Sequence, residues 1–321
     1  MDMQMPFLLQ DAVEKLLNDM PQKAVRDAAA ALSLRYRTDE KAPAGVRLLD
    51  SETEMRAYCA FRMPATYAAL VRAMEMLRQS GVEALATLTD VGSGTGSALW
   101  AADEVFGVRS AELIERESGM IALARQLAQE KWQEGIRWTQ ADMLAAQIPH
   151  ADLVTASFCL GELNQDNAEE MVKKLWEAAD RALIIAEPGT PAGHSRIRRY
   201  VEVLRQLGAH MAAPCPSMGD CPLAQEDWCH FTVRVERTRL HKFLKEGALP
   251  YEDEKFSFLA VTKKPVQPAQ SRIRRRPLIR SGYVELPICR EGAAETIRVA
   301  KKHPGYKQAR KAEVGDRWEE M

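Results

Sequence analysis

The chain has 321 residues and a formal net charge of −1 at pH 7, with 46% hydrophobic and 28% charged residues. This balance excludes an intrinsically disordered chain, and the sequence has no apolar run near the roughly 18–20 residues that a membrane span needs. The start of the chain is acidic and unlike a secretory signal or transit peptide, so we expect a cytoplasmic protein without membrane contact. Because one core usually takes about 100–150 residues, the length predicts two structural units or one α/β domain with large extensions.

Basic residues are unevenly distributed along the chain. The segment from Lys263 to Lys311 holds 14 of the 44 Lys and Arg residues but three of the 45 acidic residues. Segregation of this kind is typical of a surface that meets a polyanion, and equally of a basic tail that docks on an acidic body.

Residues 1–85 are predicted to form a helical N-terminal extension. Apolar residues recur at helical spacing near the start of the chain and again from Tyr67 to Leu77. We expect Pro64 near the start of the later helix and Gly81 just past its end. The spacing assigns no chemistry to this region.

Residues 86–264 alternate between strand and helix patterns, and this alternation predicts a mostly parallel sheet of the α/β class. Strand patterns occupy residues 86–96, 110–118, 136–143, 151–160 and 181–190, and helix patterns occupy residues 97–107, 119–132 and 167–180. A late strand is predicted at residues 254–264, after a basic helical segment and an inserted cysteine loop at residues 212–232.

A glycine-rich loop ends the first of these strands and opens a helix. Glycines let the backbone approach a ligand closely, and a helix N-terminus favours polar or anionic groups. The alternatives are a dinucleotide dehydrogenase, an S-adenosylmethionine (SAM) methyltransferase and a purely structural turn. A carboxylate precedes the glycines and would repel a pyrophosphate, and an acid ends the next strand, where it can accept ribose hydroxyls. We therefore predict a SAM site formed by Asp90, Gly92, Gly94, Gly96, Glu115 and Asp142.

No catalytic residue can be assigned. The fourth strand ends in Ser-Phe-Cys-Leu-Gly-Glu-Leu-Asn, where many amino-methyltransferases that act on nucleobases carry an Asn-Pro-Pro-aromatic signature. Cys159 could serve as a nucleophile, but an inert buried cysteine is the more common outcome. Glu162 and Glu187 are expected near the same sheet edge, either as substrate contacts or as ordinary strand-end acids.

Three of the six cysteines, Cys215, Cys221 and Cys229, fall within fifteen residues, and Cys289 follows on a predicted strand. Thiolates suit zinc or an iron–sulfur cluster, but the intervals between these cysteines are wider than in most structural zinc sites. Prolines after two of the cysteines are a feature of iron–sulfur loops. The alternative is a loop of small buried residues, with His230 as core packing or as a neighbour of the metal ligands.

The last segment, residues 265–321, is predicted to contain a Pro- and Arg-rich linker, a β-hairpin joined through residues 291–294, and a charged end. Arginine forks bind phosphate and nearby aromatic rings can stack on unpaired bases, although such runs are usually solvated faces. We predict RNA contacts from Arg272, Arg274, Arg275, Arg276, Arg280, Lys301, Lys302, Lys307 and Arg310.

These motifs together resemble the methyltransferase-like family of ribosomal small-subunit assembly factors, which is known from mitochondria and has bacterial members. The resemblance covers nearly the whole chain, from Arg-Met-Pro-Ala-Thr-Tyr at residues 62–67 to the segment at residues 305–318. It is most specific in the cysteine segment at residues 215–231. It implies a class I SAM-dependent methyltransferase (Rossmann-like) fold, association with small-subunit rRNA, and a [4Fe-4S] cluster on Cys215, Cys221, Cys229 and Cys289.

The first hypothesis is therefore a monomeric, SAM-binding, iron–sulfur-containing assembly factor that binds small-subunit rRNA, with methyl transfer to rRNA as an additional hypothesis. The second is an active SAM-dependent methyltransferase that acts on a small molecule or a protein, with zinc on the cysteines and an incidental basic tail. A shared fold alone cannot decide between them, because one fold serves many functions.

Overall fold

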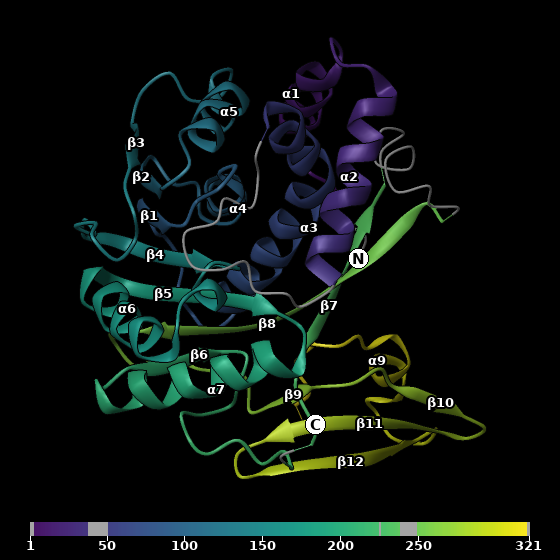
Figure 1. Cartoon of the computed structure of the whole chain (residues 1–321). Coiled ribbons are helices and arrows are strands. Elements are labelled where there is room, and N and C mark those ends of the chain that lie inside the picture. Colours follow the sequence, from purple (N-terminus) through teal and green to yellow (C-terminus); the bar gives the residue numbers. More distant parts are fainter. Residues whose placement is uncertain (1–2, 38–50, 225, 238–248, 320–321) are drawn as a thin grey trace.

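The computed structural model describes residues 3–37, 51–224, 226–237 and 249–319. It contains a large mixed sheet covered by helices on both faces and a smaller sheet near the C-terminus (Figure 1). Parts of two predicted helical regions, residues 38–50 and 238–248, lie outside the described residues.

The large sheet has the strand order β3-β2-β1-β4-β5-β8-β6, with β7 also paired to β8. Its first five strands run parallel, whereas β8 is antiparallel to β5, β6 and β7. This order confirms the predicted class I SAM-dependent methyltransferase (Rossmann-like) fold. The strands are β1 (Thr87–Val91), β2 (Ser110–Glu115), β3 (Ile136–Gln140), β4 (Ala151–Ser157), β5 (Ala179–Pro188), β6 (His210–Ala213), β7 (Phe231–Glu236) and β8 (Tyr251–Thr262).

Apolar side chains fill both faces of the sheet. Along β5, Ile184 and Ala186 belong to the core on one face and Leu183 and Ile185 to the core on the other. Buried parallel strands read as continuous apolar runs for this reason. The second face is covered by α6 (Gln165–Ala178) and α7 (Pro191–Gln206), and the first by α4 (Ser97–Phe106), α5 (Ser118–Ala128) and the N-terminal helices.

The predicted helical extension is confirmed for the described residues as α1 (Phe7–Leu17), α2 (Gln22–Arg37) and α3 (Glu52–Arg78). Ser51 caps α3 by accepting a hydrogen bond from the Glu54 amide at 3.2 Å. The expectation for Pro64 was wrong, because this residue lies in the middle of α3. An interior proline removes one helical hydrogen bond, and the extensive burial of α3 against the sheet and α2 compensates for that loss.

The C-terminal unit contains β9 (Ser271–Ile273), β10 (Leu278–Arg280), β11 (Tyr283–Arg290), β12 (Ala293–Ala300) and α9 (Tyr306–Lys311). The predicted hairpin is confirmed as β11 and β12, but its turn is shorter than expected because pairing continues to Arg290 and Ala293. Gly292 permits this tight turn with a φ of 70°. Part of the predicted linker forms β9, which pairs with β11.

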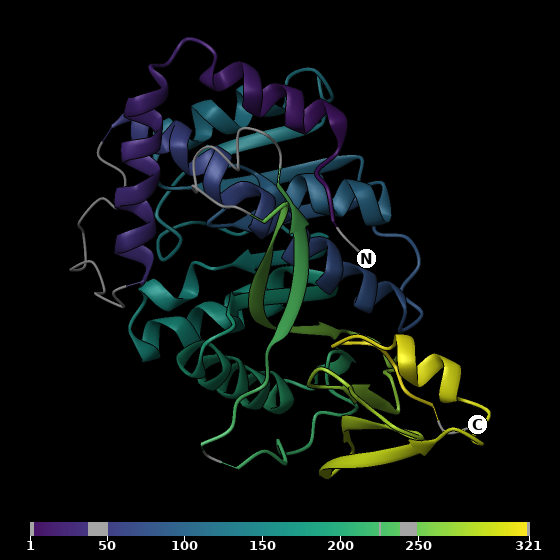
Figure 2. The same cartoon turned by 90° about the vertical axis from the view of Figure 1, so that its right-hand side faces the viewer.

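The C-terminal unit docks on the main body beside α3 and the cysteine segment, as Figure 2 shows. Asp316 accepts a hydrogen bond from Arg72 of α3 at 2.9 Å. Trp318 and Ile273 belong to the small core of this unit. Among the described helices, none combines the length and the apolar character that crossing a membrane requires.

Candidate functional site

The glycine loop joins β1 to α4 at the carboxyl edge of the parallel strands. Gly92, Gly94 and Gly96 have φ values of 70°, 52° and 79°, a region that disfavours residues with a side chain. The amides of Gly92 and Ser93 donate to the Ile114 carbonyl at 2.9 and 3.1 Å, which ties the loop to the end of β2. The structure therefore brings the three predicted glycines together in one backbone cradle.

Gly92 also lies against the loop that follows β4. A Cβ atom placed on Gly92 would lie 2.8 Å from both Cβ and Sγ of Cys159. Met143 contacts the same position from the loop after β3, with its Cε at 3.6 Å. Met143 was not predicted at the site, and an isolated methionine carries no sequence signal for such a role.

Glu115 ends β2 directly beside the glycine loop. Its carboxylate accepts hydrogen bonds from the Gly94 amide at 2.8 Å and from the Glu117 amide at 2.9 Å. Each carboxylate oxygen retains acceptor capacity for a further donor. Asp142 is exposed after β3, and its carboxylate accepts a hydrogen bond from the Leu144 amide at 2.9 Å. Both acids lie at the sheet edge where a bound nucleoside is held in folds of this class.

Asp90 occupies a different position from the one expected of a ligand-facing carboxylate. It is 1% exposed, and its Oδ1 accepts a hydrogen bond from the Thr155 hydroxyl of β4 at 2.6 Å. Its Oδ2 is buried and has no hydrogen-bond partner among the described residues. Burial raises the pKa of this carboxyl to about 7. Asp90 thus lies beneath the loop and supports it from inside the sheet.

The edge at β4 and β5 contains no exposed nucleophile. Cys159 is 7% exposed, and its thiol donates to the Val91 carbonyl at 3.4 Å. Burial and the carboxylates of Glu162 and Glu187 raise the pKa of this thiol well above its usual value, so it remains protonated and unreactive. Glu187 is fully buried and accepts two hydrogen bonds from Arg196 on one oxygen, at 2.8 and 3.0 Å. The contacts of Cys159 and Glu187 stabilise this edge of the sheet, and they assign no catalytic residue.

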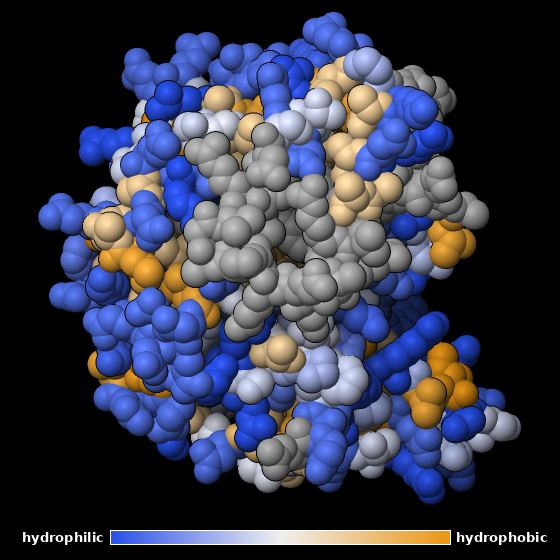
Figure 3. Space-filling view, viewed as in Figure 1, coloured by the Kyte–Doolittle hydropathy of each residue, from blue (hydrophilic) through white to orange (hydrophobic). Residues whose placement is uncertain are grey.

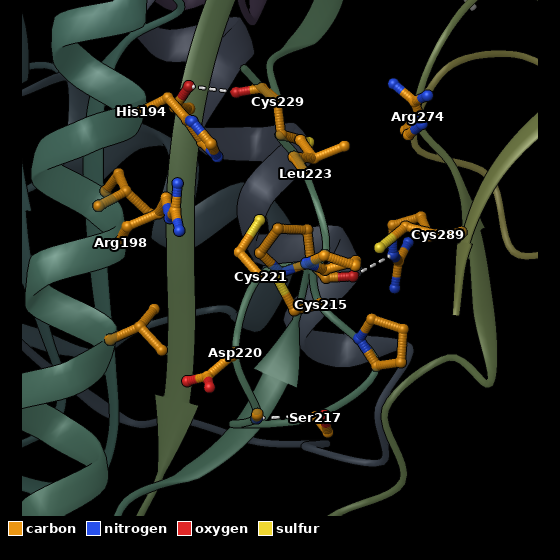
Figure 4. Close-up of a pocket in the computed structure, with 18 of the residues that line it drawn as sticks. His194, Arg198, Cys215, Ser217, Asp220, Cys221, Leu223, Cys229, Arg274 and Cys289 are labelled. Atoms are coloured by element: carbon orange, nitrogen blue, oxygen red, sulfur yellow. Dashed lines mark hydrogen bonds between the residues drawn. The ribbon is translucent and has the colours of Figure 1, made fainter. Parts of the chain in front are cut away.

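The four cysteines of the predicted metal site line one cavity of about 440 Å³ (Figure 4). Cys215, Cys221 and Cys229 lie in the segment between β6 and β7, and Cys289 lies on β11. All four are free thiols. Among the described residues, no group of three or more His, Cys, Asp or Glu side chains is arranged so that it could hold a metal ion.

Arginines surround this cavity and alter its electrostatics. Desolvation in the cavity and the neighbouring thiols raise the pKa of Cys229 to about 12 and also raise the pKa of Cys215, although Cys215 is exposed as a whole residue. Desolvation and the neighbouring Cys221 raise the pKa of Cys289. Arg272 and Arg274 line the cavity wall. Arg272 Nη2 and Arg274 Nε are buried without a hydrogen-bond partner in the described part of the chain. The cavity therefore combines protonated thiols with cationic N–H groups that lack acceptors.

The structure removes one residue from the predicted RNA-binding set. Arg272 is 2% exposed, and its guanidinium donates to the carbonyls of Pro214 and Gly315, both at 2.7 Å. An arginine was expected at the surface, but Arg272 is buried and links the residues before Cys215 to the C-terminal unit through these two hydrogen bonds. Arg274 and Arg275 are partly buried, and both form ion pairs with Asp227 of the cysteine segment.

The other predicted RNA-binding residues remain on the surface. Figure 3 shows that the face of the C-terminal unit, at the lower right, is largely hydrophilic. The exposed side chains of this set are those of Arg276, Arg280, Lys301, Lys302, Lys307 and Arg310. His230 does not line the cysteine cavity; its ring stacks on Trp228 with 6.0 Å between ring centroids.

Comparisons with known proteins place these features in context. The chain is similar to the human "Ribosome assembly protein METTL17, mitochondrial", at 27% identity over 81% of this chain and 61% of the relative. It is also similar to the "Rsm22-cox11 tandem protein 2, mitochondrial" of Schizosaccharomyces pombe, at 22% identity over 95% of this chain and 47% of the relative. The chain thus spans about half to three fifths of the length of these curated relatives.

One solved structure with a similar fold is the SAM-bound magnesium protoporphyrin IX methyltransferase of Synechocystis PCC 6803, at 16% identity and a TM-score of 0.43, with coverage of 77% of this chain and 100% of that chain. The family model Rsm22, described as "Mitochondrial small ribosomal subunit Rsm22", matches residues 52–319. This match covers α3, both sheets and the four cysteines, and the chain therefore belongs to the Rsm22 family.

Proposed function

We propose that this protein is a SAM-binding, iron–sulfur-containing methyltransferase-like protein that binds small-subunit rRNA and assists ribosome assembly. The observation that carries the proposal is that Cys289 of the C-terminal unit lines the same cavity as the three cysteines of the segment between β6 and β7, in a chain whose C-terminal unit also exposes basic residues. A human relative bears the name of a ribosome assembly protein, which supports the same function here. A cytoplasmic, monomeric protein remains part of the proposal.

The four cysteines line one cavity, and a metal cofactor held by their thiolates would draw them into a ligand set that the described residues do not form by themselves. Arg272 Nη2 and Arg274 Nε, on two residues that line the cavity, have no hydrogen-bond partner among the described residues. Four thiolates on a metal centre would carry net negative charge, and hydrogen bonds to their sulfurs would satisfy these donors. Cys215, Cys221, Cys229 and Cys289 would be the ligands. The bound group would cross-link the cysteine segment to β11, because Cys289 lies on that strand. This cross-link would stabilise the C-terminal unit, since the free energy of metal binding contributes directly to folding.

The cysteine segment favours a cluster over a single zinc ion in our proposal. The intervals between Cys215, Cys221 and Cys229 are wider than those of most structural zinc sites. Prolines follow Cys215 and Cys221, as in iron–sulfur loops. We therefore propose [4Fe-4S], with zinc as the alternative.

The glycine loop supports SAM as the second cofactor. At the carboxyl edge of the sheet, the Gly94 amide donates a hydrogen bond to the Glu115 carboxylate, so the loop backbone and this side chain lie next to each other. The open acceptors of Glu115 suit the two ribose hydroxyls, and the close backbone of the loop suits the rest of the nucleoside. Because the described residues of this edge assign no catalytic role to any side chain, SAM is proposed first as a ligand and second as a methyl donor to rRNA.

Protein purified without oxygen is expected to contain about four irons and four sulfides per chain. Cys221→Ser should lose most of this iron and make residues after 212 more sensitive to proteolysis, because the clamp is lost. Elemental analysis, a sulfide assay and limited proteolysis measure these effects. Cys59→Ala is the matched control, because Cys59 is buried in α3 outside the cavity. Zinc at about one per chain would support the alternative cofactor, and full iron retention in Cys221→Ser would contradict the ligand assignment.

RNA binding is expected to weaken steeply with salt, because each phosphate contact releases counterions. Charge reversal of Lys301 and Lys302 together should lower the affinity for small-subunit rRNA fragments by about tenfold or more and reduce the salt slope by about two. Fluorescence anisotropy over a salt series measures both quantities. Arg125→Glu on α5 is the control, because Arg125 is equally exposed but lies outside the C-terminal unit. Equal losses in both variants would contradict a binding surface on that unit.

A further inference from the structure

A second cavity, of about 360 Å³, lies between the first two turns of α7 and the cysteine segment. Its polar walls are formed by His194, Ser195, Arg198, Glu226, Asp227 and Trp228. Because α7 begins only two residues after β5, this cavity lies at the carboxyl edge of the sheet, as does the glycine loop. Ligands of open α/β sheets bind at this edge.

The α7 side of the cavity suits an anionic group. Arg198 is exposed and forms no ion pair or hydrogen bond with any described residue. Arg198 is the eighth residue of the 16-residue helix α7 and lines both cavities, so its guanidinium rather than the helix N-terminus supplies the positive charge. Figure 4 shows that His194 and Arg198 both point away from α7 towards the cysteine segment.

His194 is the second observation that points to a ligand. It is 7% exposed and lines both cavities, yet its ring makes no hydrogen bond within the described part of the chain. Burial lowers its pKa to about 4, so its neutral ring offers one donor and one acceptor. Because its ring nitrogens are not among the fully buried atoms without a partner, they are open to a ligand or to water from the cavities that the residue lines.

The opposite wall presents a fixed aromatic ring. The indole N–H of Trp228 donates to the Gly189 carbonyl at 3.3 Å, and the His230 ring stacks against the same indole. The neighbouring Asp227 carboxylate is already paired with Arg274 and Arg275, so its charge is compensated. The exposed Glu226 carboxylate also lines this wall, and Arg198 must outweigh its charge for an anion to bind. The Arg275 guanidinium also lies over the Trp228 indole, with its Cζ 5.6 Å from the ring centroid. A base of any identity can stack on the part of the ring that His230 and Arg275 leave uncovered.

We propose that this cavity receives one unpaired nucleotide of an RNA strand, with its phosphate on Arg198 and its base against Trp228. The volume suits one small ligand group and excludes a base pair in a duplex. Because the basic C-terminal unit borders the same segment through Arg274 and Arg275, the flanking nucleotides would continue onto that surface. The proposal rests on the proposed rRNA binding and names where one nucleotide of that RNA is held.

The test is a titration of the metal-loaded full chain with a single-stranded RNA of about twelve nucleotides that contains 2-aminopurine, which loses fluorescence when it stacks. Arg198→Ala should weaken binding about fivefold and lower the salt slope by about one. Trp228→Phe should retain the fold but reduce the fluorescence change. Arg205→Ala, on the same helix but outside both cavities, should behave as the unchanged protein. Duplex RNA of the same sequence should show no difference between Arg198→Ala and the unchanged protein.

Three results would overturn the inference. If single-stranded RNA binds equally to Arg198→Ala, Trp228→Phe and Arg205→Ala, the cavity holds no nucleotide, whereas the proposed rRNA binding would stand. If adenosine monophosphate binds as tightly as the strand and with the same loss in Arg198→Ala, the ligand is a free nucleotide rather than RNA. If the unchanged protein binds no RNA at all, the proposed function fails together with this site.

Discussion

Gly92→Ala is expected to lower the free energy of unfolding by about 3 kcal/mol and to abolish SAM binding. Two costs combine at this position: the backbone has a φ of 70°, and the new Cβ would lie 2.8 Å from Cβ and Sγ of Cys159. Because Cys159 is itself buried, it cannot swing aside, and the loop must move. Chemical denaturation measures the stability loss, and isothermal titration with SAM measures the binding.

Gly94→Ala provides the matched control in the same loop. Its φ of 52° imposes a similar backbone cost, but the nearest side-chain atom is Met120 Cε at 3.8 Å, an ordinary contact. The stability loss should therefore be about 1 kcal/mol. Adding Cys159→Gly to Gly92→Ala should restore part of the stability, because both crowding atoms are removed. Equal losses in the two alanine variants would contradict a steric cause.

Arg272→Ala is expected to destabilise the protein by about 3 kcal/mol, because it leaves two buried carbonyls without donors. The carbonyls of Pro214 and Gly315 both accept a hydrogen bond from this guanidinium at 2.7 Å. These two residues lie about 100 positions apart in the sequence, so Arg272 links segments that are distant along the chain. The C-terminal unit should loosen first. Hydrogen exchange of β9 and β11, together with denaturant unfolding, measures the effect.

The control for this variant is Arg276→Ala, four residues along the same segment. Arg276 is exposed, so its removal should change stability by less than about 0.5 kcal/mol while weakening RNA binding. The two variants thus distinguish an arginine that stabilises the fold, Arg272, from an arginine that is expected to bind RNA, Arg276. If Arg272→Ala is as stable as the unchanged protein but binds RNA more weakly, Arg272 belongs to the RNA-binding surface and its stabilising role is contradicted.

Much of the fold can be predicted because its signals are local. Continuous apolar runs identify β4 and β5, and the glycine loop fixes the start of α4. The position of Pro64 inside α3 could not be predicted, because the burial that offsets a helix-interior proline arises from distant elements. The same holds for β9, whose residues resemble a linker until β11 offers them a partner.

The candidate site divides in a similar way. Glu115 and the glycines follow from their spacing around β1 and β2, and the structure brings them together. Arginine type and clustering cannot show that Arg272 is buried, because its burial depends on two carbonyls far along the chain. The cavity at α7 was missed because its walls come from segments that meet only in the folded protein: the motif of the cysteine segment points to its thiols, and α7 carries no motif.

The antiparallel strand β8 sets the order in which this molecule can be completed during its own synthesis. In the part of the chain that the structure describes, the two strands that flank the cysteine segment, β6 and β7, enter the large sheet by pairing with β8. Three cysteines therefore stay unanchored until residues 251–262 have emerged, and the fourth, Cys289, comes later still. Because domains fold as the chain is delivered from its N-terminus, the glycine loop can form long before the four cysteines meet. The cysteine cavity is consequently completed late, when synthesis of the chain is nearly finished.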